Sequence, residues 1–452
     1  MGFAALRRVS SESLISRSTV LQDQRSQRRP DPTGHCQAPR QFSRRGLLQS
    51  TLGGAVGLTV AGEGLAAAPA VPPPRKLLLL FLSGGASQLE TFDPKPDSKY
   101  GGPFRPIASS VPGVQVGELL PHTARILNRL AVIRSVNTGE RSHFRGHYLL
   151  QSGRKVPGYP VLGSVMARLL ERPGDELPGY VTLRRQNPQA YTDVGDAGFL
   201  GPRYEGVMLI DGKPPANIVR PKSLDVASEK KRDHIRRLTN RRFLERRIPG
   251  AIQAYADSYR KAAALMRRRD VFDLEQESAA DRQRYGEHHF GRNCLLARRL
   301  LESGVHCVKV AHHDWDAHFE NFHWQRQRCL EFDRTFATLM DDFRDRGLLE
   351  ETLVVIVGEM GRTPRINYYG GRDHWGDAWS MAFAGCGIRP GVVLGKTNAL
   401  GTEVVDGAVD AGDLFHTILA AMGLDSTGNH QVGGRDNPIA DPASSVIKEV
   451  LS

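Results

Sequence analysis

Cysteine is scarce in this chain. Only five cysteines occur among 452 residues, and no two of them form a Cys-x-x-Cys pair. A zinc site built on cysteine pairs is therefore not expected. Beyond Cys36, the remaining four are widely spaced: Cys294, Cys307, Cys329 and Cys386. One or two disulfides in an oxidising compartment would explain them, and buried free thiols would explain them equally well.

A long apolar run is missing near the amino terminus. The stretch Leu47–Leu65 contains Gly, Ser, Gln and Glu63, so it is too polar for a stable membrane span. A twin-arginine pattern, Ser43–Leu48, overlaps its start, and Ala66–Ala68 provides an A-x-A cleavage signal after it. We therefore expect residues 1–68 to be a disordered extension plus a twin-arginine signal peptide. The export partner is then the twin-arginine machinery, and the mature chain is periplasmic or secreted; a membrane anchor is the alternative.

The chain also lacks a basic stripe interleaved with aromatic residues. Its net charge is +12, but the lysines and arginines are scattered, so nucleic-acid binding is not expected. Several Arg pairs fall in a charged segment, about 223–284, whose pattern predicts two helices, Ala227–Glu245 and Ala251–Arg269. We interpret this segment as a helical cap or insert whose arginines are mostly solvated; binding of an anionic polymer is the other interpretation.

Three apolar runs predict buried strands of a parallel sheet: Lys76–Leu82, Val305–Ala311 and Leu353–Val357. Helical patterns occur between them, which favours an α/β fold with a mixed, largely parallel sheet between helices. At this length, residues 69–452 are sufficient for one large α/β domain.

Two of these strands end in clusters of acids and histidines. His312–His318 follows the second strand, and Gly358–Arg362 follows the third, with Asp373-His374 a little further on. Because α/β proteins place their sites at the carboxyl ends of strands, two neighbouring strands would bring these groups together as a metal site. Zinc is the divalent metal we expect, with manganese or calcium as alternatives. The candidate ligands are Asp316, His318, Glu359 and His374. Asp373 would orient His374 or cap the loop.

The sequence blocks WDAH, GEMGRTP and GRDHW, together with SGGASQLETFDPKP after the first strand, resemble the domain of unknown function 1501 family. That family resembles the alkaline phosphatase and sulfatase superfamily, and the likeness covers the chain from about Ser43. It implies an alkaline-phosphatase-like three-layer sandwich. It also implies a metal-dependent hydrolase acting on phosphate or sulfate esters of a small molecule or a polysaccharide.

The resemblance is incomplete at several positions. Ser83 stands where phosphatase-like enzymes carry a metal-binding Asp, Glu359 stands in place of another Asp, and Met360 stands in place of its His partner. We therefore expect one metal ion rather than two. Glu90 and Asp93 are further candidate ligands, although Asp93 would equally suit a turn before proline.

The resemblance places His143 at the nucleophile position, with Ser142 beside it. His147 follows one turn later and would share a face with His143, unless both are surface histidines. No cysteine is present where a formylglycine precursor would be needed, so a standard sulfatase mechanism is not expected. The catalytic candidates are thus Ser142, His143 and Arg362. The planar fork of Arg362 would clamp a phosphate or sulfate, or else form a structural salt bridge.

Two functions of different classes remain open. One is an exported metal-dependent hydrolase, in which a metal-bound water could replace a covalent nucleophile and Glu90, Asp314 or His143 could act as the base. The other is a non-catalytic secreted binding or assembly protein on a degenerate phosphatase-like scaffold. The clustered acid and histidine blocks favour the first, and the departures from the phosphatase pattern favour the second.

Overall fold

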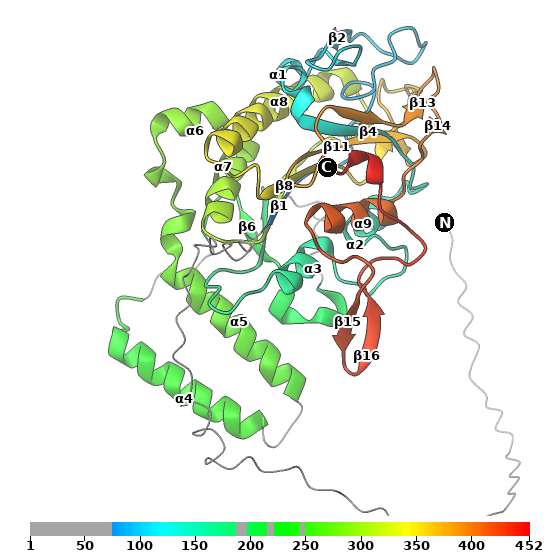
Figure 1. Ribbon diagram of the computed structural model, residues 1–452. Helices are drawn as coiled ribbons and strands as arrows, with labels where there is room; N and C mark the ends of the chain where they lie inside the picture. Colours follow the sequence, from blue (N-terminus) through cyan, green and yellow to red (C-terminus); the bar gives the residue numbers. More distant parts are fainter. Residues whose placement is uncertain (1–74, 187–196, 215–220, 245–248) are drawn as a thin grey trace, which may run out of the picture. The chain divides into compact units, whose positions relative to one another are not determined.

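The computed structural model describes residues 75–186, 197–214, 221–244 and 249–452 (Figure 1). The predicted extension and twin-arginine signal peptide lie outside the described residues, as does most of the proline-rich segment that follows. Among the described residues, no helix combines the length and the apolar character needed to cross a membrane.

An eight-stranded sheet forms the centre of the fold, in the order β12-β4-β11-β8-β1-β7-β5-β6. Every strand runs parallel to its neighbours except β11, which is antiparallel to both β4 and β8. This confirms the predicted mixed, largely parallel sheet. The strands are β1 Lys76–Leu82, β4 Leu130–Val136, β5 Tyr180–Arg184, β6 Val207–Ile210, β7 Cys307–His312, β8 Thr352–Val357, β11 Trp379–Gly385 and β12 Val392–Leu394.

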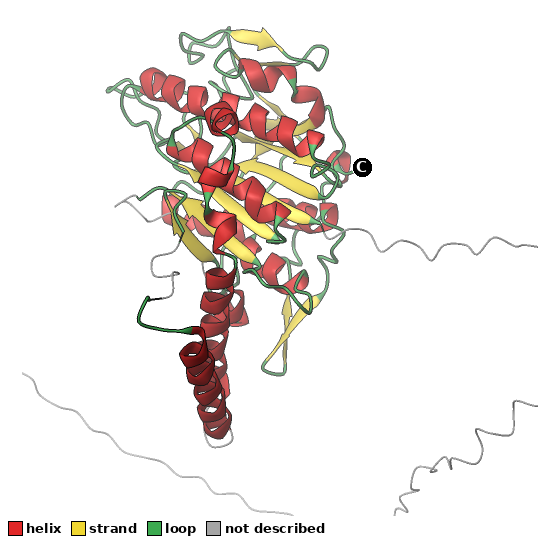
Figure 2. Cartoon of the chain, turned by 90° about the vertical axis from the view of Figure 1, so that its left-hand side faces the viewer, coloured by secondary structure: helices red, strands yellow, loops and turns green. Residues whose placement is uncertain are grey.

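Helices cover both faces of this sheet, which gives three layers (Figures 1 and 2). In β1, Leu78 and Leu80 pack into one hydrophobic core, whereas Leu77 and Leu79 pack into another. Because side chains alternate along a strand, the two cores lie on opposite faces. The first core is covered by α7 (His289–Glu302) and α8 (Asn321–Asp345), the second by α2 (His143–Ser152), α3 (Leu162–Leu169) and α9 (Ala411–Ala421).

Two sequence-based expectations need correction here. The strands β7 and β8 are not neighbours, because β1 lies between them and pairs with both. The second expectation concerns Leu119–Leu130, whose pattern predicts one amphipathic helix, whereas the structure has no single helix there. A short helix, α1 (Pro121–Arg125), is followed by a 3-10 turn at Leu127–Arg129. Pro121 lies in the first helical turn, where its missing amide hydrogen is tolerated, and Leu130 already belongs to β4, so a helix cannot span the whole segment.

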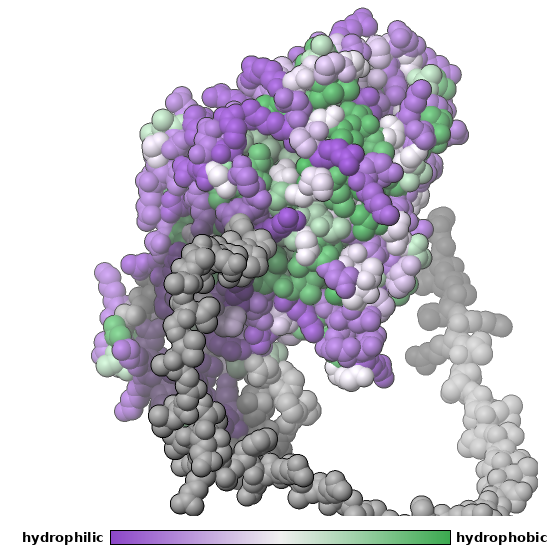
Figure 3. Space-filling view, viewed as in Figure 1, coloured by the Kyte–Doolittle hydropathy of each residue, from purple (hydrophilic) through white to green (hydrophobic). Residues whose placement is uncertain are grey.

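The charged segment contains two long helices, α4 (Val226–Leu244) and α5 (Pro249–Arg267), at the positions predicted from sequence. Figure 2 shows the pair running away from the sheet as a helical arm. On the face seen in Figure 3, the surface of α4 is mostly hydrophilic. The remaining elements are α6 (Ala279–Tyr285), the 3-10 turns at 198–200, 202–204, 269–272, 274–276 and 448–450, and four two-stranded ribbons: β2–β3 (106–108, 115–117), β9–β10 (361–362, 374–375), β13–β14 (396–397, 404–406) and β15–β16 (429–432, 435–438).

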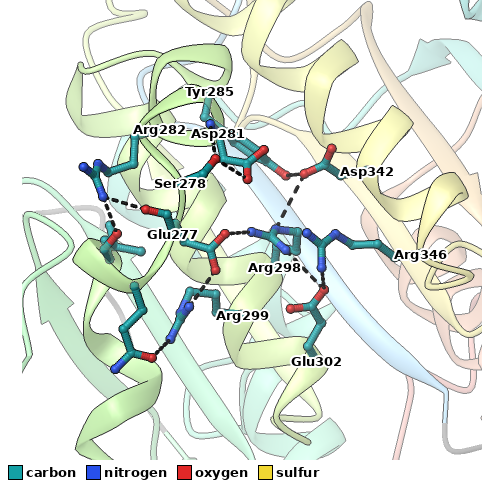
Figure 4. A network of polar contacts seen from close by, with 12 residues as sticks. Glu277, Ser278, Asp281, Arg282, Tyr285, Arg298, Arg299, Glu302, Asp342 and Arg346 are labelled. Atoms are coloured by element: carbon teal, nitrogen blue, oxygen red, sulfur yellow. Dashed lines mark hydrogen bonds and ion pairs between the residues drawn. The ribbon is translucent and has the colours of Figure 1, made fainter.

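A buried arginine joins the elements on the α7 side of the sheet (Figure 4). Arg298 of α7 is 1% exposed; its Nη2 bonds Glu277, and its Nε lies 3.7 Å from Asp342 of α8. The Tyr285 hydroxyl donates to the same Asp342 carboxylate at 2.9 Å. Arg298 also reaches Glu302 at 3.3 Å. The guanidinium therefore joins α7, α8 and the turn before α6, and Asp342 adds Tyr285 of α6 to the network.

The cysteines of the described residues are free and buried. Cys294, Cys307, Cys329 and Cys386 form no disulfide. Burial raises the pKa of Cys294 and Cys329 well above the usual value and that of Cys386 to about 11. The sequence allowed either disulfides or buried free thiols, and the structure shows buried free thiols at these four positions.

Candidate metal centre

Three imidazoles converge on one carboxylate at the carboxyl edge of the sheet. Asp316 and His318 lie in the loop after β7, His143 is the first residue of α2, and His374 begins β10. Asp316 Oδ1 lies 2.9 Å from His318 Nε2 and 3.2 Å from His374 Nε2, while Asp316 Oδ2 lies 3.1 Å from His143 Nε2. The two Nε2 atoms of His318 and His374 are 3.0 Å apart.

Each of these histidines has an oxygen acceptor at its other ring nitrogen. His143 Nδ1 lies 2.7 Å from Glu359 Oε1, His318 Nδ1 lies 3.0 Å from Asp373 Oδ1, and His374 Nδ1 lies 2.7 Å from the carbonyl oxygen of Arg141. A carbonyl oxygen can only accept, and the two carboxylates are acceptors when ionised, so each Nδ1 carries the hydrogen. In the neutral imidazoles each Nε2 therefore has a lone pair, and each Nε2 lies within 3.2 Å of an Asp316 oxygen.

This arrangement fits a divalent cation. Ligand atoms of His143, Asp316 and His374 all lie within 4.8 Å of one another. Ligands about 2.0–2.1 Å from a tetrahedral zinc would be about 3.3 Å apart, close to the 2.9–3.2 Å between the atoms of this cluster. Two imidazole lone pairs 3.0 Å apart repel each other unless a cation lies between or beside them. Imidazole nitrogen with one carboxylate is a donor set suited to zinc, whereas calcium prefers oxygen ligands.

Glu359 lies behind His143 and is completely buried. Its Oε1 accepts from the backbone amide of Gly84 at 2.8 Å, and its Oε2 has no hydrogen-bond partner among the described residues. Burial alone would lower the pKa of His143, but hydrogen bonds to Asp316 and Glu359 outweigh it and raise the pKa to about 9. Burial favours the neutral form of Asp316, yet its contacts with His143 and His374 and the charge of Arg362 hold its pKa far below the usual range.

Arg362 is also completely buried, and each of its guanidinium nitrogens has a protein partner. Nη2 lies 2.5 Å from Asp316 Oδ1 and donates to the Gly84 carbonyl, Nε donates to the Gly85 carbonyl at 3.0 Å, and Nη1 donates to the Arg372 carbonyl at 3.2 Å. This geometry favours the structural ion pair over a free anion clamp.

The two glycines of the SGG block allow this close packing. Gly84 and Gly85 have φ values of 106° and 84°, and a Cβ at Gly84 would lie 2.5 Å from the backbone nitrogen of Asp316. Only glycine adopts such a conformation without strain. The block after β1 therefore serves to bring the Asp316 loop and the Glu359 loop together.

The other sequence candidates lie beside this cluster or away from it. Ser142 is the residue before α2, and its backbone amide donates to Glu140 Oε1 at 2.8 Å. His147 is buried in the core, where its Nε2 lies 3.0 Å from Lys309 Nζ, so it is not a surface histidine. Glu90 pairs with the buried Arg372 at 2.7 Å, and Asp93 bonds Lys95 and Thr397.

Solved structures that resemble the chain are distant. A lipoteichoic acid synthase from Listeria monocytogenes is 8% identical, covers 81% of this chain and 75% of its own, and has a TM-score of 0.37. A sulfatase from Pseudoalteromonas sp. is 13% identical, covers 78% of this chain and 68% of its own, and has a TM-score of 0.37. A protein in the alkaline phosphatase superfamily from Vibrio parahaemolyticus is 10% identical. The match covers 78% of this chain and 67% of that protein, with a TM-score of 0.35. At these values the likeness says nothing about substrate.

In sequence, no curated protein matches the chain. The family model described as "Protein of unknown function (DUF1501)" matches residues 74–451, which is nearly the whole of the described structure. The chain belongs to this family.

Proposed function

We propose that this protein is an exported, metal-dependent hydrolase of phosphate or sulfate esters, carried on a small molecule or a polysaccharide. The observation that supports it best is the orientation of three histidines, each with Nδ1 bound to an oxygen and Nε2 directed at Asp316. Outer partners of this kind fix the tautomer of metal-binding histidines.

In this proposal, the cation is zinc, with manganese as the second candidate. His143, Asp316 and His374 hold it, and His318 completes the cluster or leaves a position open for substrate. Glu359 and Asp373 act from behind as positioning residues. His143, a catalytic candidate in the sequence, is thus a metal ligand in this proposal, and Glu359, a ligand candidate, is not. When bound, a divalent cation polarises an ester oxygen and lowers the pKa of a coordinated water.

The protein residues supply position and charge. Arg362 holds the Asp316 carboxylate in place, so that it remains ionised and directed at the histidines. Ser142 stands next to His143 at the start of α2 and remains the candidate hydroxyl nucleophile, since metal coordination or an adjacent base can activate a serine. Export by the twin-arginine route remains a proposal from the sequence, because Arg44 and Arg45 lie outside the described residues.

Turnover tests this function. The purified mature protein is assayed with aryl phosphates, phosphodiesters and aryl sulfates after chelation and after return of zinc or manganese. We expect turnover that needs the metal and falls at least about 100-fold in Asp316→Ala and His374→Ala. His323→Ala, which removes an exposed histidine of α8, is the control and should change the rate less than about twofold. A metal-loaded protein without turnover on any of these esters would instead support a binding or assembly role.

A further inference from the structure

A cavity lined mostly by polar residues lies at the carboxyl edge of the sheet, away from the three-histidine cluster. It has a volume of about 150 Å³ and lies between the ends of β5 and β7, the start of α7 and the middle of α8. Its lining residues are Arg185, His288, His289, Phe290, Ala311, His312, His313, Arg328 and Glu331. None of these residues belongs to the metal centre described above.

The charges around this cavity are balanced. Arg185 Nη2 lies 2.5 Å from Asp314 Oδ1, and Arg328 Nη1 lies 3.1 Å from Glu331 Oε2. Burial lowers the pKa of His312 to about 4 and that of His313 to about 3, so both are neutral at pH 7. Two cations facing two carboxylates leave no net charge that would favour an ion of either sign.

Two further histidines, His288 and His289, line the cavity at the start of α7. Burial lowers the pKa of His288, which accepts from the Gly291 amide at 3.1 Å. His289 lies 3.0 Å from Asp211. Neither histidine adds an uncompensated charge to the cavity.

Several lining groups carry a buried polar atom that has no partner among the described residues. They include both donors and acceptors. His312 Nε2 lies 3.1 Å from Glu331 Oε2 and therefore carries the hydrogen, which makes its unpartnered Nδ1 an acceptor. The Nε–H groups of Arg185 and Arg328 are unpartnered donors, and His313 Nε2 is unpartnered as well. His312 and His313 are only 3% and 4% exposed.

A hydroxyl group satisfies both kinds of atom, because it donates one hydrogen bond and accepts others. An oxyanion would satisfy only the donors and would be repelled by Glu331 and Asp314. The space is sufficient for a six-membered ring, since apolar cavities of about 150 Å³ take up benzene. Phe290, which stacks on His312 with ring centroids 4.2 Å apart, provides an apolar wall for such a ring.

We propose that this cavity binds one neutral, hydroxylated six-membered ring, that is, a single pyranose unit. On binding, the side chains of His312, Arg185 and Arg328 turn towards the cavity, so that the hydroxyls donate to His312 Nδ1 and accept from the two arginines, and the ring packs against Phe290. This binding stands whether or not the metal centre hydrolyses an ester, so it is tested without turnover.

Isothermal titration with a panel of methyl pyranosides tests the proposal on the full mature protein. We expect at least one glycoside to bind, and Arg328→Gln to weaken that binding at least about tenfold because a charged donor is lost. The matched control Arg326→Gln, an exposed arginine of the same helix, should change the dissociation constant less than about twofold. His313→Leu is a second variant with the same expected loss. His374→Ala should bind the glycoside normally, which separates this result from failure of the proposed hydrolase.

Three results would overturn the proposal. The first is no binding of any glycoside to the wild-type protein. The second is binding of inorganic sulfate or phosphate that depends on Arg328 while no glycoside binds, which would make the cavity an oxyanion site. The third comes from a wild-type crystal soaked with the tightest glycoside: the sugar lying outside the cavity would contradict the proposal even if both variants fail to fold.

Discussion

The candidate metal centre is identified by which ring atoms of its histidines are bonded, and to what, rather than by residue types alone. The imidazoles of His143, His318 and His374 would be ordinary polar groups if their Nδ1 atoms faced solvent. Instead, Glu359, Asp373 and a backbone carbonyl fix each ring. At the scale of the residue, Glu359 is the most informative of these partners, because it is completely buried and one of its oxygens is unpartnered.

Glu359→Gln should weaken zinc binding by about 10- to 100-fold, because an amide of the same shape orients His143 less strongly than a carboxylate does. Competition with a coloured chelator measures the affinity. Glu403→Gln, at an exposed position, is the control and should leave it unchanged. If Glu359→Gln abolished binding as completely as His374→Ala does, Glu359 would be a direct ligand.

Two buried histidines should make the protein acid-sensitive. In the folded state the pKa is about 4 for His312 and about 3 for His313, both lowered mainly by burial, against about 6.5 in the unfolded chain. Between these values the unfolded chain binds more protons, so the free energy of unfolding decreases as pH falls from about 6.5 towards 4. At pH 5.5 the loss is about 1 kcal/mol per histidine. Urea unfolding at pH 7.5 and 5.5, with chelator present, measures it. His313→Leu should reduce the loss, and equal stability at both pH values would contradict the assignment.

At the scale of the element, apolar runs predicted the buried strands well. Lys76–Leu82 is β1 to the residue, and the other two runs lie within two residues of β7 and β8. The antiparallel strand β11, Trp379–Gly385, was missed. Its sequence, WSMAFAG, contains small residues and only Trp, Met and Phe as large apolar side chains, so periodicity alone does not distinguish it from a loop or a short helix. It is a strand because it lies between β8 and β4, which is a tertiary effect.

The Arg298 network makes a prediction about how the helices are held together. Arg298→Met should lower the free energy of unfolding by about 3–5 kcal/mol, because Glu277 and Asp342 lose a shared buried cation. Arg346→Met removes a 43% exposed arginine from the same network and should cost less than about 1 kcal/mol. Chemical denaturation compares the two. If both variants lost a similar free energy of unfolding, the burial of Arg298 would not explain its contribution to stability.

At the scale of the whole molecule, the sequence predicted which strand ends supply the candidate site better than it predicted which side chains contact one another there. Strand ends placed Asp316, His318, Glu359 and His374 at one edge of the sheet. The sequence could not show that His143 approaches from α2, some 170 residues earlier in the chain than Asp316, and lies between Asp316 and Glu359. Nor could it show that Asp373 bonds His318 rather than His374, since that depends on how the loop 367–373 folds back.

The central claim is that one divalent cation is bound by imidazole Nε2 atoms and the Asp316 carboxylate. Zinc-edge X-ray absorption on the purified, zinc-loaded mature protein tests this most directly. The account predicts about one zinc per chain, with two to three imidazole nitrogens and one or two oxygens at about 2.0–2.1 Å, and one imidazole fewer in His374→Ala. A protein that takes up no zinc, or a zinc whose shell is unchanged in His374→Ala, would contradict it.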